Sequence, residues 1–146
     1  MNLLTQEITD KGFVRNLIPQ EKPFVMVDKL LFFSTEQVTS GLTVEVENLF
    51  SHNNTFTAPG LIEHMAQTVA LYTGYQYFLK NEPAPVGYIG AIKKITIHRL
   101  PSLSEELVTT ATILHEIMGV TLVEIQTESK GEVLATSQMK TVIANH

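Results

Sequence analysis

The sequence predicts an α+β fold in which a sheet wraps around one long central helix. Two observations support this prediction. The segment 59–80 is predicted to be a single helix, because Pro59 suits a helix start and no further proline follows until Pro83. The chain on either side of this helix has the apolar patterns of β-strands. One helix face carries a residue at every fourth position, namely Ile62, Ala66, Ala70 and Gly74. Three of these four are very small, so this small-residue face should lie close to whatever covers it.

The remaining segments are assigned from their apolar patterns. Residues 1–20 are predicted to form a partly helical arm that packs over the sheet. Residues 23–33 are almost continuously apolar, which indicates a strand covered on both faces. Residues 49–57 should form a polar loop that turns at Asn53-Asn54. Alternating apolar residues predict half-buried strands at 37–48, 86–99, 106–118, 120–128 and 133–143. We expect one domain over residues 1–146, with His115 as a hydrogen-bonded core residue.

Composition excludes several classes of function. The formal net charge of −5 argues against nucleic acid as a general partner. The chain has no cysteine, so it has no disulfide and no thiol nucleophile. Its first residues lack the basic and apolar regions of a signal peptide, and no apolar run approaches the length of a membrane span. We therefore expect a cytoplasmic protein without a membrane span.

Glu63 is the first candidate for chemistry. It is expected in the first turn of the helix, beside the unpaired backbone N–H groups that follow Pro59-Gly60. Such donors can hold a developing oxyanion while the acid transfers a proton. The alternative is that Glu63 only complements the helix dipole, as acids at helix starts commonly do.

Three motifs resemble those of the hot-dog-fold 3-hydroxyacyl-acyl-carrier-protein dehydratases. Within Ala58–Gly74, a Pro-Gly pair leads to a Glu followed by Met-Ala-Gln, as in the helix of that family. Leu17–Asp28 is similar to its Leu-Pro-His-x-x-Pro-Phe-Leu-Leu-Val-Asp segment, with Gln20 in place of the His. Gly87–Ile92 and the following Arg99–Pro101 resemble a third landmark. The chain looks most like the branch found in bacterial polyene and pigment clusters.

The resemblance implies a hot dog fold, a dimer that shares one sheet, and active sites at the subunit interface. It implies removal of water from a 3-hydroxyacyl thioester to give a trans-2-enoyl thioester. The substrate would be carried on the phosphopantetheine of an acyl-carrier protein, or presented as an acyl-CoA. No metal or cofactor of the chain's own is expected, since no metal-spaced cluster or phosphate-binding loop occurs.

The resemblance assigns roles to residues of the predicted helix. Glu63 matches the general acid, and the amide of Gly60 or Leu61 would hold the oxyanion. Gln67 lies one turn after Glu63 on the same face and would orient it by a hydrogen bond. Alternatively, Gln67 is a solvated or interfacial side chain.

The base is assigned to a histidine. His52 lies just before the helix, near the place of the family's catalytic His, but the family's His-Phe-Pro-Gly turn is absent and the interval to Glu63 is shorter. His52 could equally be an ordinary loop histidine. His64 is the rival base, although it lies about 100° around the helix from Glu63. Its alternative role is an interfacial or partly buried histidine hydrogen-bonded to backbone.

Lys93, Lys94 and Arg99 concentrate positive charge in an acidic chain. Because carrier proteins are acidic, this strand is a candidate docking surface. A solvated strand face is the alternative. Three functions stay open: a dehydratase with Glu63 as acid and His52 as base, a non-catalytic partner of a related dehydratase in a heterodimer, and a hot-dog acyl thioesterase.

Overall fold

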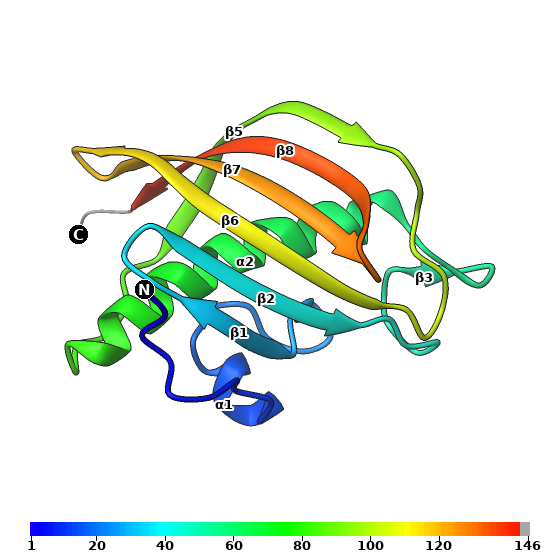
Figure 1. The fold of residues 1–146 in the computed structure, drawn as a ribbon, viewed down its shortest axis with the longest axis horizontal. Helices are drawn as coiled ribbons and strands as arrows, with labels where there is room; N and C mark the ends of the chain where they lie inside the picture. The colour runs from blue at the N-terminus through cyan, green and yellow to red at the C-terminus, as the bar shows by residue number, and fades with distance from the viewer. Residues whose placement is uncertain (144–146) are drawn as a thin grey trace.

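The chain folds into a six-stranded antiparallel sheet curved around one long helix, α2 (Ala58–Leu79), in a computed structural model that describes residues 1–143 (Figure 1). This arrangement confirms the predicted α+β class. The strands, in their order across the sheet, are β1 (Lys29–Phe33), β2 (Gln37–Thr43), β6 (Glu106–Ile117), β7 (Val120–Ser129), β8 (Glu132–Ile143) and β5 (Gly87–Ile97).

Helix α2 packs on β2, β6 and β7 and supplies the centre of the core. Pro59 is its second residue, where a missing N–H leaves no bond unmade. The helix therefore starts at Ala58, one residue earlier than predicted, and Glu63 lies in its second turn rather than its first. The buried apolar residues of the helix are Leu61, Met65, Val69, Leu71, Tyr72 and Tyr75.

The small-residue face of α2 does not lie against the sheet. Gly74 abuts the backbone carbonyl of Leu17, in the N-terminal arm, so closely that a Cβ would not fit there. Ala66 and Ala70 are only half-buried and face a cavity. The small side chains thus allow a close approach to the arm and leave space beside the helix.

The first predicted strand is shorter than expected. Regular pairing begins at Lys29, whereas residues 23–28 precede the strand and do not belong to it. The N–H of Met26 donates to the side chain of Gln67, at 2.6 Å, instead of to a neighbouring strand. The buried side chain of Gln67 thus accepts the hydrogen bond that a neighbouring strand would otherwise accept. The apolar pattern of the sequence does not indicate this replacement.

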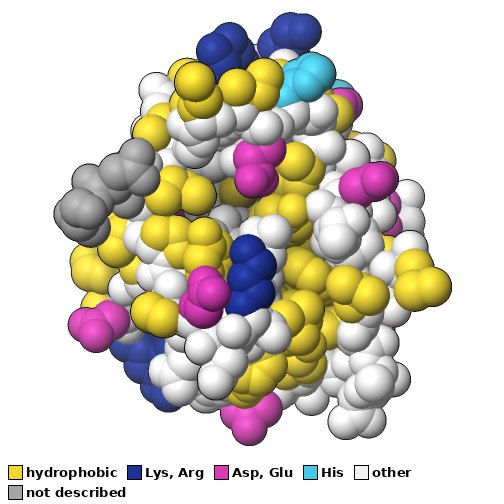
Figure 2. Space-filling model, turned by 90° about the vertical axis from the view of Figure 1, so that its left-hand side faces the viewer, with side chains coloured by type: hydrophobic (Ala, Val, Ile, Leu, Met, Phe, Trp, Pro, Cys, Tyr) yellow, Lys and Arg dark blue, Asp and Glu magenta, His cyan; other side chains and the backbone are white. Residues whose placement is uncertain are grey.

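The hairpin of β6 and β7 extends beyond α2 and carries apolar side chains into solvent. Ile117 is 66% exposed and Met118 is 96% exposed. A shift in pairing between Ile113 and His115 interrupts the strand alternation, and His115 is exposed. Its prediction as a core residue was wrong for that reason. Figure 2 shows hydrophobic side chains spread over much of the end of the molecule that bears this hairpin.

The two edges of the sheet differ. The N-terminal arm pairs with the β1 edge, through bonds between Ile8 and Leu30 in both directions, at 2.8 and 2.9 Å. This arm includes the short helix α1 (Lys11–Arg15). At the other edge, β5 is bonded only to β8 within residues 1–143, and almost all of its residues are exposed.

Candidate functional site

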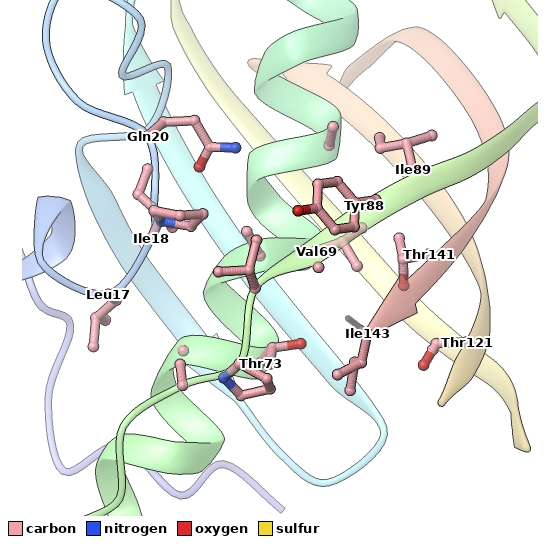
Figure 3. Close-up of a pocket in the computed structure, with 18 of the residues that line it drawn as sticks. Leu17, Ile18, Gln20, Val69, Thr73, Tyr88, Ile89, Thr121, Thr141 and Ile143 are labelled. Atoms are coloured by element: carbon pink, nitrogen blue, oxygen red, sulfur yellow. The ribbon is translucent and has the colours of Figure 1, made fainter. Parts of the chain in front are cut away.

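A cavity of about 440 Å³ lies between α2, the N-terminal arm and the outer strands (Figure 3). Its volume lies within the usual range of small-molecule sites. The α2 wall is the small-residue face described above, with Glu63 at its N-terminal end. The opposite wall combines the segment 84–89, which leads into β5, with side chains at the ends of β7 and β8. Figure 3 labels five residues of this second wall: Tyr88, Ile89, Thr121, Thr141 and Ile143.

Glu63 is fixed by Gln67, one turn further along α2. The Gln67 Nε2 donates to Glu63 Oε2 at 2.8 Å and to the carbonyl of Phe24 at 2.7 Å. The same amide accepts from the N–H of Met26 through Oε1. Gln67 is fully buried, so these bonds are shielded from water. The predicted orienting hydrogen bond is confirmed, and the alternative of a solvated glutamine is wrong.

His64 is held on the other side of the helix. It is fully buried, and its Nδ1 and Nε2 lie 2.6 Å from the Met26 carbonyl and 2.7 Å from Thr109 Oγ1. Burial lowers the pKa of His64 to about 4, although the Met26 carbonyl and Asp28 oppose the shift. Both ring nitrogens are occupied and the side chain does not line the cavity. The structure therefore contradicts His64 as a base and agrees with a buried histidine bound to backbone.

His52 lies on a small hairpin formed by β3 (Ser51–His52) and β4 (Thr55–Phe56). Asn53 and Asn54 have positive φ angles of 51° and 63°, as expected for the predicted turn. His52 is exposed and does not line the cavity that contains Glu63. Within one chain, the structure does not bring the two candidate catalytic residues into one site.

The proposed oxyanion donors are also separated from the cavity in one chain. The N–H of Leu61 donates to the Thr57 carbonyl at 3.0 Å within the helix, so its assignment as a donor was wrong. Gly60 is buried against Phe50 and Phe56 and is not part of the cavity lining. Glu63 lies nearly one turn after Gly60, so the two residues are neighbours on the helix surface, although only Glu63 lines the cavity.

The basic residues of the β5 region divide into two groups. Arg99 makes a bidentate ion pair with Glu105, at 2.7 and 3.0 Å, and binds Glu132 at 3.1 Å. The Arg99 hydrogen bonds lower the pKa of Glu105 to about 2, so Arg99 is neutralised locally and is not a free docking charge. Lys93 and Lys94 are exposed. The nearby Lys140 lowers the pKa of Lys93, so three cations share this surface.

Gln20 is a site residue that sequence reasoning did not assign. Its side chain reaches the cavity from the loop after α1, and its Oε1 is buried without a hydrogen-bond partner in residues 1–143. The departure from the family's Leu-Pro-His motif at this position was the only sequence signal. A changed residue in an otherwise similar motif gives no indication of where its side chain points.

Within residues 1–143, a helix with the length and apolar character of a membrane span does not occur. No curated protein sequence matches the chain significantly.

Solved structures with a similar fold include a dehydratase heterocomplex and a hypothetical thioesterase. The dehydratase heterocomplex ApeI:P from Xenorhabdus doucetiae is 20% identical, with a TM-score of 0.84 over 90% of this chain and 91% of that chain. A hypothetical thioesterase with coenzyme A from Streptococcus pneumoniae is 9% identical, with a TM-score of 0.64 over 80% and 85% of the two chains. The PaaI protein of the E. coli phenylacetic acid degradation operon is 13% identical, with a TM-score of 0.63 over 77% and 80%.

These similarities confirm the hot dog fold that the motifs implied. The family model for ApeP-like dehydratases matches residues 13–145, nearly the whole chain. The chain therefore belongs to the ApeP-like dehydratase family.

Proposed function

We propose that the chain is a subunit of a dehydratase that acts on 3-hydroxyacyl thioesters, with Glu63 as the general acid. The observation that supports this proposal most is the placement of Glu63. Its carboxylate lies in the wall of a cavity of suitable volume for an acyl group, and Gln67 fixes one of its oxygens. A general acid has to be held within hydrogen-bond reach of the group it protonates. The hydrogen bond from Gln67 restricts the Glu63 side chain to one orientation and so meets this requirement.

The reaction divides the work between an acid and a base. The base takes the proton from C2 of the acyl group, the C2=C3 double bond forms, and the C3–O bond breaks. Glu63 would give its proton to the departing hydroxyl, which leaves as water. Amide donors hold the charge that develops on the thioester oxygen, and Gly60 stays our candidate for that role.

We place the base in a neighbouring subunit, because no histidine lines the cavity in the described part of the chain. Strand β5 offers a place for that subunit. Its free edge is eleven residues long, and Tyr88, Ile92 and Ile95 are exposed along it. Unprotected apolar edges of this kind readily pair with another chain. We propose that a second copy pairs there and that its His52 faces Glu63.

Complementation between subunits tests this assignment. His52→Ala and Glu63→Gln are each expected to lose most of their turnover, since general acid–base catalysis contributes about 10²–10⁴-fold. After the two variants are mixed and allowed to exchange subunits, each mixed dimer regains one intact site. Activity should then return to about a quarter of the wild-type value, as a two-fold symmetric dimer requires. Mixing without any recovery would contradict a shared site.

A related dehydratase subunit is the second candidate for the partner. The absence of the family's His-Phe-Pro-Gly turn favours it, and the similar ApeI:P structure is a dehydratase heterocomplex. In that case the wild-type chain, purified alone, would show no turnover. The same purified chain would release free thiol if it were a thioesterase.

Lys93, Lys94 and Lys140 form the surface that we propose for an acidic carrier protein. Because exposed charges act at long range, replacing Lys93 and Lys94 by serine should raise the KM for a carrier-bound substrate. The KM for the same acyl group on coenzyme A serves as the control.

A further inference from the structure

Gln20 presents an unsatisfied hydrogen-bond acceptor at the cavity. Its Oε1 is buried, yet no N–H or O–H of residues 1–143 donates to it. Leaving a buried acceptor unpaired is costly, so such groups are rare and require an explanation such as a bound ligand. Gln20 is one of only two residues with such a side-chain atom among the described residues, the other being Ser129, which does not line this cavity.

The position of Gln20 along α2 follows from the contacts of its neighbours in sequence. Leu17 lies against Gly74, and further along the chain Phe24 and Met26 are bonded to Gln67. The chain after Leu17 therefore runs back along the helix towards Glu63, and Gln20 lies between these two contacts. Figure 3 shows its amide extending from the loop towards α2, with Tyr88 and Ile89 entering the cavity from β5.

The buried acceptor would be satisfied by a ligand group that donates a hydrogen bond. On the α2 wall of the cavity, Ala66 and Val69 offer no polar side-chain group. A saturated acyl chain also carries no donor. In a 3-hydroxyacyl group, the donor nearest to the acid is the C3 hydroxyl itself, because Glu63 has to reach the oxygen of that hydroxyl.

We propose that Gln20 Oε1 accepts a hydrogen bond from the C3 hydroxyl of the substrate and thereby selects the hydroxylated acyl group. Gln20 holds the hydroxyl O–H on one side while Glu63 protonates the oxygen. When the C3–O bond breaks, the leaving water keeps an O–H directed at the amide. No proton passes to Gln20, which remains neutral throughout. This inference rests on the proposed function, since it assigns the recognition of the same substrate.

Binding measurements separate this role from turnover. The test uses the full chain carrying Glu63→Gln, which prevents dehydration during the measurement. Calorimetric titrations with 3-hydroxyoctanoyl-CoA and octanoyl-CoA then give the preference for the hydroxyl. The parent should bind the hydroxylated compound about three- to tenfold more tightly, as expected for one hydrogen bond. Adding Gln20→Met should remove this preference and leave the affinity for octanoyl-CoA within about twofold, because methionine has a similar length and no strong hydrogen-bonding group.

Gln126→Met is the matched control, since Gln126 is exposed on β7 and is not part of the cavity lining. It should keep the preference. Equal binding of the two compounds by the parent would overturn the role of Gln20 while leaving an acyl-binding cavity. A preference that survives Gln20→Met would also overturn it. Absence of binding by either compound would overturn both this inference and the proposed function.

Discussion

At the scale of single residues, α2 carries two adjacent side chains with opposite environments. Glu63 faces the cavity and is held by Gln67, whereas His64 is enclosed between α2 and the sheet. His64 bridges the Met26 carbonyl and Thr109, and Thr109 continues to Thr127 at 2.6 Å. This buried chain links the helix to β6 and β7, so His64 contributes to stability rather than to proton transfer.

Burial of neutral His64 predicts a loss of stability in acid. Its pKa is about 4 in the folded protein and 6.5 in the unfolded chain, so between these values the unfolded state binds more protons. The contribution is complete above pH 6.5 and is lost as the pH falls towards 4. By the size of the shift, the free energy of unfolding should fall by about 3 kcal/mol over this range.

Urea denaturation of the wild type and of His64→Gln, at several pH values, measures this effect. The variant should show a smaller decrease between pH 6.5 and 4, because glutamine does not titrate. The exposed His115→Gln should behave as the wild type does. An identical pH dependence in wild type and His64→Gln would contradict a buried neutral histidine.

At the scale of the element, the small-residue face of α2 forms one wall of the cavity that we propose for the acyl chain. Ala70 is half-buried and lines the cavity midway along the helix. Ala70→Leu should fill part of this space, at little cost to the fold because leucine is a good helix former. Long-chain acyl-CoA compounds should then bind at least about tenfold more weakly, while short-chain compounds are less affected.

Titration with a series of acyl-CoA compounds of increasing length checks this prediction. Ala58→Leu is the matched control, because Ala58 is also a half-buried alanine of α2 but is not part of the cavity lining. It should keep the wild-type dependence of affinity on chain length. A uniform loss of affinity at every chain length in Ala70→Leu would contradict the placement of the acyl chain along α2.

At the scale of the whole molecule, the free edge of β5 predicts self-association. Ile92 is 44% exposed near the middle of this strand. Ile92→Lys would place a charge in the proposed interface, where it cannot be solvated, and should shift the protein towards the monomer. Analytical ultracentrifugation measures the change. Ile117→Lys, on the exposed β6–β7 hairpin, is the control and should keep the wild-type mass. Equal masses for all three proteins would argue against an interface along β5.

The sequence was sufficient for the class of the fold because its signals are local. Proline placement bounded α2 to within one residue, and strand alternation located β6, β7 and β8. The failures involve contacts between distant residues. The hydrogen bond from the Met26 N–H to Gln67 replaced strand pairing at the start of the first predicted strand, and the shift in pairing between Ile113 and His115 left His115 exposed.

For the candidate site, too, the sequence predicted the local contact and missed the contacts between distant residues. Glu63 and Gln67 are one helical turn apart, so their contact follows from the period of the helix. The burial of His64 depends on Thr109, far away in the sequence, and the cavity that Gln20 reaches depends on the arm and β5 together. No local pattern contains that information.

The most direct test of Glu63 as the acid of a dehydratase is turnover of a 3-hydroxyacyl thioester by the wild-type protein and by Glu63→Gln. Enoyl absorbance and free thiol should be followed together in one assay. We expect enoyl formation without thiol release, reduced about 10²–10⁴-fold in Glu63→Gln. Release of thiol by the wild type, or enoyl formation that Glu63→Gln leaves unchanged, would contradict a dehydratase that uses Glu63 as its acid.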